Sequence, residues 1–231
     1  MSGLGLNYWK EVIGVLRNII PVYDKVNKSI SLGQDDKYRE CGLNGQIRPG
    51  DLILDAGSGF GNMSSKALEI LKDDARIILH DPIHEMLHYA QNLRNQRLNL
   101  SCGVFEYMPF RESCVDAVLC GYSLRDAFSL VEAISEIHRV LKNDGRFIIV
   151  DIGKPDNAFF RTMVTFYLKY ILGIIAYSVS GRRGLRFKTL YGTFTRWPNN
   201  GILNDLLIKK FSRVKFTKKL FGGAIIVVAF K

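Results

Sequence analysis

Hydrophobic residues in the first part of the chain recur at helical spacing. Between residues 8 and 30 they stand three or four positions apart, up to a break at Pro21: Trp9, Val12, Ile13, Leu16, Ile19 and Ile20. This spacing predicts an amphipathic helix that Pro21 interrupts. A second, shorter helix is expected over 36–43, and Arg48-Pro49-Gly50 marks a turn after it. We therefore expect residues 1–47 to form a helical N-terminal lid.

The pattern changes after this turn. Short apolar runs alternate with amphipathic stretches, which predicts right-handed strand–helix–strand units and a mostly parallel sheet. Strands are expected at 51–54, 76–79, 98–102, 115–120 and 146–150, and helices at 63–71, 83–95 and 128–141. Residues 48–153 would form the core of the fold.

The end of the chain follows another pattern. Strands are expected at 213–220 and 224–230, joined through Phe221-Gly222-Gly223. So short a connection requires an antiparallel hairpin. The whole pattern predicts an α/β fold: a doubly wound, seven-stranded, mostly parallel sheet of the Rossmann-like kind, closed by a C-terminal antiparallel hairpin. Helical lid elements precede the first strand and follow the fifth.

A chain of 231 residues can bury one sizeable core, which favours a single domain over 1–231. Within it we expect a helical insertion at 154–198 and a last helix with the hairpin at 199–231. Hydrophobic residues make up 47% of the chain and charged residues 23%, as in globular proteins. The net charge of +10 suits an anionic partner, such as nucleic acid, anionic lipid or an acidic ligand, without choosing among them.

The cysteines indicate a reducing compartment. They form no C-x-x-C pair and no cluster with the spacing of zinc ligands: Cys41, Cys102, Cys114 and Cys120. We expect free thiols and no metal site. Residues 1–10 lack a basic segment followed by an apolar run, so we expect no signal peptide and a cytoplasmic protein.

The first strand of the core leads into a glycine-rich turn, Asp55-Ala56-Gly57-Ser58-Gly59-Phe60-Gly61. A chain that turns from strand to helix beneath a ligand needs positive φ and a close backbone approach, and glycine supplies both. Asp55 precedes the first glycine by two residues. A carboxylate there suits the cationic amino group of S-adenosylmethionine (SAM) and would repel the pyrophosphate of a dinucleotide. The alternative is a tight turn with a helix-capping acid.

The next strand ends in His80-Asp81-Pro82. An acid at this place, about 20 residues past the glycines, can accept hydrogen bonds from ribose hydroxyls. Asp81 can also cap the helix that follows, and both roles can hold at once.

Further motifs are spread over the chain. The more specific ones are Tyr23-Asp24-Lys25-Val26-Asn27, Ser31-Leu32-Gly33, Tyr38-Arg39, Ser123-Leu124-Arg125-Asp126 and Leu220-Phe221-Gly222-Gly223. The more general ones are Met108-Pro109-Phe110, Val115-Asp116-Ala117 and the segment 136–142. Together they resemble the quinone-biosynthesis C-methyltransferases, the UbiE/MenG group of class I SAM-dependent methyltransferases. The resemblance runs from about Tyr23 to Lys231, and the antiparallel hairpin also fits this class.

The resemblance implies SAM as the cofactor. The positions that match the family's cofactor site are Asp55, Gly57, Ser58, Gly59, Phe60, Asp81, Pro82, Met86, Val104, Phe105 and Gly121. Val104 stands where the family has an Asp that contacts the adenine amino group, so adenine would be held by backbone groups and by stacking on Phe105. Phe60, Asp126 and Arg182 also depart from the family pattern. These departures indicate a divergent member.

The resemblance also implies methyl transfer to a ring carbon of a reduced polyprenyl quinone precursor. Arg125 follows the fourth strand, where ligands bind in open sheets, and a permanent cation there would stabilise a phenolate. Asp126 would be the catalytic base or would orient Arg125. Tyr23, Tyr38 and Arg39 are expected to bind the substrate together with Arg125. The alternative for Arg125 is a salt bridge that closes the N-terminal lid.

The segment 157–188 suits a lipophilic substrate. An apolar helix over 157–180 precedes a basic cluster of Arg182, Arg183, Arg186 and Lys188, a combination that binds anionic lipid at the inner face of a membrane. Its uninterrupted apolar run, 170–179, is too short to span a bilayer. A buried lid helix with a solvated charged run is the alternative. The oligomeric state is not determined.

Two other functions stay open at this point. A methyltransferase acting on RNA or another small molecule fits the charge of +10. No RNA-binding module or N-P-P-Y-type motif accompanies it, so we expect no nucleic-acid partner. A non-catalytic scaffold of a lipid or quinone biosynthetic complex would keep the fold and tolerate the loss of Arg125.

Overall fold

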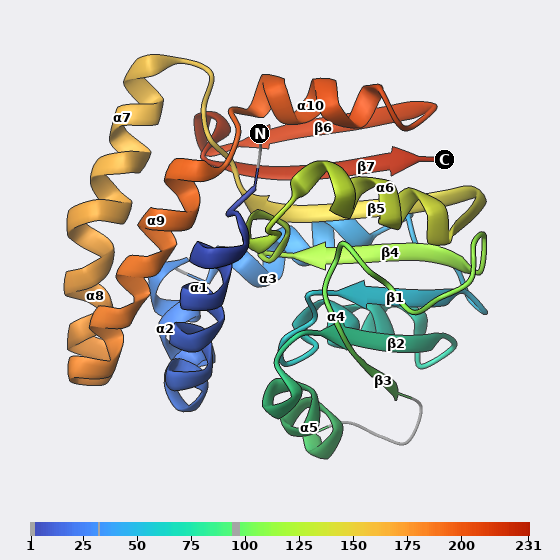
Figure 1. The fold of residues 1–231 in the computed structure, drawn as a ribbon, viewed down its shortest axis with the longest axis horizontal. Coiled ribbons are helices and arrows are strands. Elements are labelled where there is room, and N and C mark those ends of the chain that lie inside the picture. Colours follow the sequence, from blue (N-terminus) through green and yellow to red (C-terminus); the bar gives the residue numbers. More distant parts are fainter. Residues whose placement is uncertain (1–2, 32, 94–97) are drawn as a thin grey trace.

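The computed structural model describes residues 3–31, 33–93 and 98–231. Its centre is a seven-stranded sheet in the order β3-β2-β1-β4-β5-β7-β6 (Figure 1). β1 to β5 pair in parallel, and β7 runs antiparallel to β5 and β6. The strands are β1 (Leu52–Ala56), β2 (Arg76–Asp81), β3 (Leu98–Cys102), β4 (Val115–Gly121), β5 (Leu141–Ile152), β6 (Arg213–Lys219) and β7 (Ala224–Phe230). This topology confirms the predicted α/β fold.

Helices cover both faces of the sheet, as strands that are apolar on both sides require. One face carries α6 (Leu130–Val140) and α10 (Asn200–Ile208). The other carries α3 (Gln34–Leu43), α4 (Asn62–Leu71) and α5 (His84–Leu93). Each face has its own hydrophobic core. Ile53 and Leu54 are adjacent in β1 and fully buried: Leu54 packs in the core with α6 and α10, and Ile53 packs in the core with α3, α4 and α5.

The remaining helices gather at the carboxyl ends of the parallel strands (Figure 1). They are α1 (Leu6–Ile19), a 3-10 turn (Ile20–Val22), α2 (Tyr23–Ile30), α7 (Ala158–Phe166), a π-helical turn (Tyr167–Ile171), α8 (Leu172–Ser180), a 3-10 segment (Gly181–Lys188) and α9 (Thr189–Arg196). An apolar cluster joins the N-terminal group to the later one: Ile19 and Val26 pack with Leu172 and Phe194. The two groups therefore form one helical cover over this edge of the sheet.

Some boundaries differ from the predicted ones for physical reasons. Leu141 was expected to end a helix, but it pairs with Val115 and already belongs to β5. The ladder then shifts register before Arg146 pairs with Ala117. At the other end of the sheet, β6 stops one residue short of the expected Leu220, which has a φ of 48° and cannot continue a strand. Leu32 and the end of the helix expected over 83–95 fall outside the described residues.

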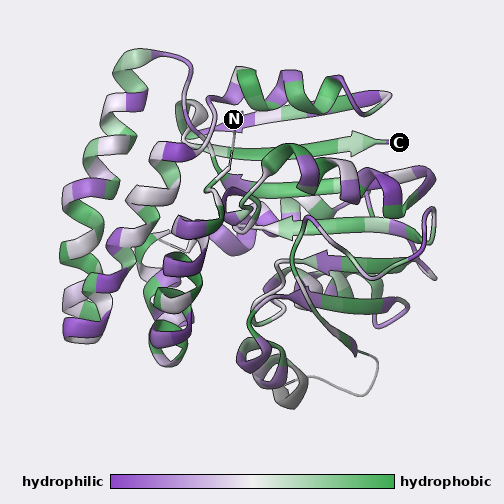
Figure 2. Ribbon diagram, in the orientation of Figure 1, coloured by the Kyte–Doolittle hydropathy of each residue, from purple (hydrophilic) through white to green (hydrophobic). Residues whose placement is uncertain are grey.

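The run Ala158–Arg196 is long and apolar enough, by length and composition alone, to cross a membrane, and 22% of its most apolar window is buried. It is not one straight helix. Gly181, with φ 61° and ψ −143°, breaks it, and α9 returns beside α7 and α8 (Figure 1). Figure 2 shows hydrophobic residues along both α7 and α8. Part of this surface packs on the rest of the cover, and part stays exposed.

Candidate active site

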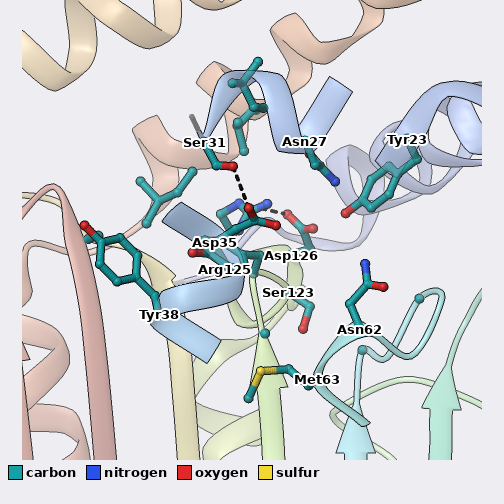
Figure 3. A pocket seen from close by; sticks show the side chains of 18 of the residues that line it. Tyr23, Asn27, Ser31, Asp35, Tyr38, Asn62, Met63, Ser123, Arg125 and Asp126 are labelled. Atoms are coloured by element: carbon teal, nitrogen blue, oxygen red, sulfur yellow. Dashed lines mark hydrogen bonds and ion pairs between the residues drawn. The ribbon is translucent and has the colours of Figure 1, made fainter. Parts of the chain in front are cut away.

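A cavity of about 550 Å³ lies between the helical cover and the carboxyl ends of β1, β2 and β4. Side chains from the sheet edge, from α3 and α4 and from the cover face one another across it in Figure 3: Ser123, Arg125, Asp126, Asp35, Tyr38, Asn62, Met63, Tyr23, Asn27 and Ser31. The strand order reverses between β1 and β4, and open α/β sheets bind ligands at such a point. The topology therefore makes this cavity the candidate active site.

The turn between β1 and α4 forms one wall of the cavity. Gly57, Gly59 and Gly61 have φ values of 65°, 52° and 71°, where a Cβ is strained. Gly57 is also tightly packed, because a Cβ at this position would lie 2.6 Å from Phe105 and from Ser123. Its N–H donates to the carbonyl of His80, the last residue but one of β2, at 2.8 Å. The glycines thus let backbone, without side chains, face the cavity.

Two polar residues of this turn differ in their hydrogen bonding. The buried carboxylate of Asp55 accepts from the backbone N–H and the hydroxyl of Ser64, at 3.1 and 2.6 Å, which ties β1 to α4. Ser58 lines the cavity, and its buried hydroxyl has no hydrogen-bond partner among the residues described. Because buried hydroxyls are normally paired, a polar ligand fits against this turn.

Asp81 ends β2 beside the same turn. One carboxylate oxygen accepts the N–H of Gly59 and the other accepts the N–H of Ile83, both at 2.8 Å. Burial raises the pKa of Asp81 to about 6, although these hydrogen bonds oppose the rise. The carboxylate caps the chain that enters α5, and its remaining lone pairs leave it able to accept hydrogen bonds from a ligand.

Ten of the predicted cofactor residues line the cavity: Asp55, Gly57, Ser58, Gly59, Phe60, Asp81, Pro82, Met86, Phe105 and Gly121. Val104 is outside the lining. Its carbonyl oxygen accepts a hydrogen bond from His80 Nε2 at 3.1 Å, and His80 Nδ1 then accepts from the Ser101 hydroxyl at 3.0 Å. The neighbouring Phe105 lines the cavity, whereas the predicted contact of Val104 with the cofactor stays a prediction that the lining does not support.

Arg125 lies in the 3-10 turn Leu124–Asp126 that follows β4. Its Nη1 donates to the buried Asp151 of β5 at 2.5 Å, and its Nε is 3.9 Å from Asp126 Oδ1. Two carboxylates thus flank one guanidinium. The alternative of a salt bridge to the N-terminal lid is corrected by this arrangement, whereas the role of Arg125 as a cation that stabilises a phenolate stays a prediction. Arg125 is paired with the sheet itself.

Asp126 is the second titratable group at this place. Burial raises its pKa to about 6, although Arg125 opposes the rise. Its side chain is 18% exposed and lines the cavity. A carboxylate of this pKa is mostly ionised at pH 7 and accepts a proton more readily than an ordinary Asp. Tyr23, whose own pKa is raised by burial, lines the same part of the cavity.

Tyr23, Tyr38 and Arg39 all reach the cavity from the N-terminal lid. The charge of Arg39 is paired: its Nη1 donates to Asp35 at 2.7 Å and to Asp36 at 3.3 Å. Burial alone would raise the pKa of Asp35, but the hydrogen bonds from Arg39 and Ser31 lower it. Arg39 is therefore paired within α3 and carries no unpaired charge into the site.

Other lining residues had no prediction from the sequence. Asp35 lines the cavity and pairs with Arg39, whereas Asp151, which pairs with Arg125, is fully buried behind the lining. Asp35 carried a weak signal, because it precedes Arg39 by four positions in a helix. The apolar part of the lining comes from distant segments that no motif connects: Phe160, Met163, Val164, Tyr167, Leu172, Leu190 and Phe221.

Comparison with known proteins shows which enzyme family the chain belongs to. The model of the ubiE/COQ5 methyltransferase family matches residues 6–231. The chain belongs to this family. It is a SAM-dependent methyltransferase, which confirms the predicted enzyme class and cofactor.

Individual relatives agree with this assignment at modest identity. The methyltransferase is 26% identical over 224 residues to the ubiquinone/menaquinone biosynthesis C-methyltransferase UbiE of Citrifermentans bemidjiense, covering 93% of this chain and 85% of the relative. It is 30% identical over 217 residues to the demethylmenaquinone methyltransferase of Streptomyces avermitilis, with coverage of 93% and 91%. The solved plantazolicin methyltransferase BpumL in complex with SAH shares the fold, with a TM-score of 0.64, 14% identity and coverage of 97% and 98%.

Proposed function

We propose that this methyltransferase methylates a ring carbon of a reduced polyprenyl quinone precursor. The names of the two relatives support this substrate class. The observation that carries the proposal is the mixed lining of the cavity. Carboxylates and hydroxyls line it at the sheet edge, and apolar side chains of α7, α8 and the β6–β7 turn line it elsewhere. A polar ring with a long apolar tail needs both surfaces.

SAM, when bound, supplies an electrophilic methyl group. The residues that would hold it are those of the glycine turn, with Asp55 for its amino group, Asp81 for its ribose hydroxyls and Phe105 for its adenine. The unpaired hydroxyl of Ser58 and the positive φ of Gly57 support this placement.

Asp126 is the proposed catalytic base. Ionised above its pKa of about 6, it accepts the proton of the ring hydroxyl, which makes the neighbouring ring carbon nucleophilic. Arg125 keeps this carboxylate ionised by its charge, and Asp151 fixes the guanidinium in place. The buried Nε of Arg125 has no hydrogen-bond partner in the described chain, so its N–H remains for the ring oxygen. Tyr23 and Tyr38 would contact the ring from the lid.

The test is turnover of reduced demethylated quinones with a polyprenyl tail. Asp126→Asn removes the proton acceptor at almost constant volume, and Asp205→Asn on the exposed face of α10 is the matched control. We expect Asp126→Asn to lower kcat by about 10²- to 10⁴-fold, while its affinity for SAM by calorimetry stays within about twofold. Normal turnover by Asp126→Asn would refute the assigned role, and failure of the wild type on every such quinol would refute the substrate class.

We also propose that the segment 157–188 contacts a membrane surface. Large apolar side chains stand three or four positions apart along α7, the π-turn and α8, each at least half exposed: Phe159, Met163, Phe166, Tyr170, Ile174 and Tyr177. They form one stripe, which we call the outer stripe. The basic cluster follows it at Arg182, Arg183, Arg186 and Lys188. An apolar stripe beside basic residues supports binding to anionic lipid.

Flotation with vesicles tests this contact. We expect the protein to float with vesicles that contain phosphatidylglycerol and to stay unbound with purely zwitterionic ones. Phe166→Ser with Ile174→Ser should reduce flotation, and Val131→Ser, an exposed residue of α6, should not. Equal flotation of the Phe166→Ser/Ile174→Ser double variant and of the Val131→Ser control would contradict the proposal.

A further inference from the structure

The turn between β6 and β7 carries two apolar residues in an unfavourable conformation. Leu220 and Phe221 have φ values of 48° and 54°, in the left-handed region that glycine occupies without strain. The two residues are 64% and 78% exposed, so burial does not offset this strain. Strained backbone that carries exposed apolar side chains indicates a function outside the folded core.

The turn is also held rigidly. The side-chain amide of Asn200, fully buried, donates to the Gly222 carbonyl at 2.9 Å and accepts the N–H of Lys154 at 2.9 Å. The N–H of Gly153 donates to the Gly223 carbonyl at 3.0 Å. These bonds tie the turn to the loop after β5. Leu220 and Phe221 are therefore presented at a defined place.

That place is an edge of the cavity. Phe221 stacks on Phe160 of α7, with ring centroids 4.6 Å apart and ring planes 7° from parallel. Both rings line the cavity, together with Met163, Val164 and Leu220. Since Phe221 is mostly exposed and also lines the cavity, the stacked pair stands between the cavity and the outside.

The surroundings of the pair match a lipid surface. Phe159 and Met163, which begin the outer stripe, are exposed on the same helix as Phe160. Lys218 and Lys219 are exposed directly before the turn, and Lys218 pairs with Asp156 at 2.7 Å. Aromatic and basic residues together are typical of the membrane interface.

We propose that Phe160 and Phe221 form an aromatic gate through which the apolar tail of the substrate passes from the bilayer into the cavity. This inference rests on the proposed substrate class and adds the entry route and the residues that select for a tail. Phe221 would pack on the tail after entry and slow its release. A short-tailed ring would not reach the gate.

Phe221→Gly tests the gate without threatening the fold, since glycine relieves the positive φ while it removes the ring. Tyr107→Ala, an aromatic that is 71% exposed and outside the cavity lining, is the matched control. Binding is followed by quenching of tryptophan fluorescence, to which Trp9 in the cavity lining contributes, with prenylated quinone in vesicles and with a tailless quinone in solution. Turnover of both reduced quinones is measured in parallel.

We expect Phe221→Gly to weaken binding of the long-tailed quinone about fivefold, as for the loss of one aromatic contact, and to leave the tailless one within about twofold. Tyr107→Ala should change neither. Equal affinities of wild type and Phe221→Gly for the long-tailed quinone, or equal losses for both quinones, would overturn the gate. Tail-selective binding without any turnover would keep the gate and reject the proposed reaction, and a wild type that binds no tailed quinone would reject both.

Discussion

Gly57→Ala should lower the stability of the folded protein. The new Cβ carries two penalties. The first is conformational, since φ at this position is 65° and a left-handed conformation costs a non-glycine residue about 1–2 kcal/mol. The second is steric, because the methyl group would lie 2.6 Å from Phe105 and from Ser123. Forcing a methyl group into such a contact costs about 1–3 kcal/mol. The expected loss of stability is thus about 2–5 kcal/mol.

Gly45→Ala separates the two penalties. Gly45 has a φ of 71° and a Cβ there would meet no heavy atom within 4 Å, so only the conformational cost applies. Urea unfolding should therefore show that Gly57→Ala loses about 1–3 kcal/mol more than Gly45→Ala.

The two variants should also differ in cofactor binding. Phe105 and Ser123 line the cavity, so their displacement by Gly57→Ala should weaken the affinity for SAM more than about tenfold in calorimetry. A tenfold change corresponds to about 1.4 kcal/mol of binding free energy. Gly45 is an exposed loop residue, and its variant should bind SAM like the wild type. Equal stability and equal SAM affinity of the two variants would show that the turn at Gly57 tolerates a side chain and would refute the reasoning.

Two further predictions concern the buried charges. Asp151→Asn removes the negative charge that is paired with the buried guanidinium of Arg125, so the free energy of unfolding should fall by about 3–5 kcal/mol in urea titrations. A loss below about 1 kcal/mol would contradict the pairing. Asp81 and Asp126 have pKa values raised from 3.8 to about 6, so each binds its proton more tightly in the folded state than in the unfolded state. Their protonation therefore stabilises the folded state at low pH. This stabilisation is lost as the pH rises from about 4 to 6. The full loss of folding free energy is about 3 kcal/mol for each group. Asp126→Asn should therefore make the decline in stability between about pH 4 and 6 less steep. Turnover should rise between about pH 5 and 7, where Asp126 ionises with its pKa of about 6, and a flat pH–rate profile over this range would exclude it as the base.

The glycine turn and the acid beside it could be predicted from local sequence, and the apolar part of the cavity lining could not. The glycine turn and Asp81 each follow directly after a buried strand, so their placement at one sheet edge follows from the parallel pattern. Val104 shows that a match to a family position does not place a residue in the cavity. Its backbone carbonyl accepts a hydrogen bond from His80, a contact between β2 and the chain after β3 that no local sequence signal marks. Arg125 was located correctly at the end of β4, but its pairing with Asp151 of β5 depends on which strand lies next to it.

Periodicity and turn residues were sufficient for the order of strands and helices and for the antiparallel hairpin at the end, because side-chain spacing and short connections act locally along the chain. Motifs were sufficient for the family and the cofactor. Only the tertiary structure decided the charge balance at Arg125, the enclosure of the cavity and the stacking of Phe160 on Phe221. Each of these joins segments separated by tens of residues, and the energy of a buried ion pair or an aromatic contact depends on the distance and burial that folding alone creates.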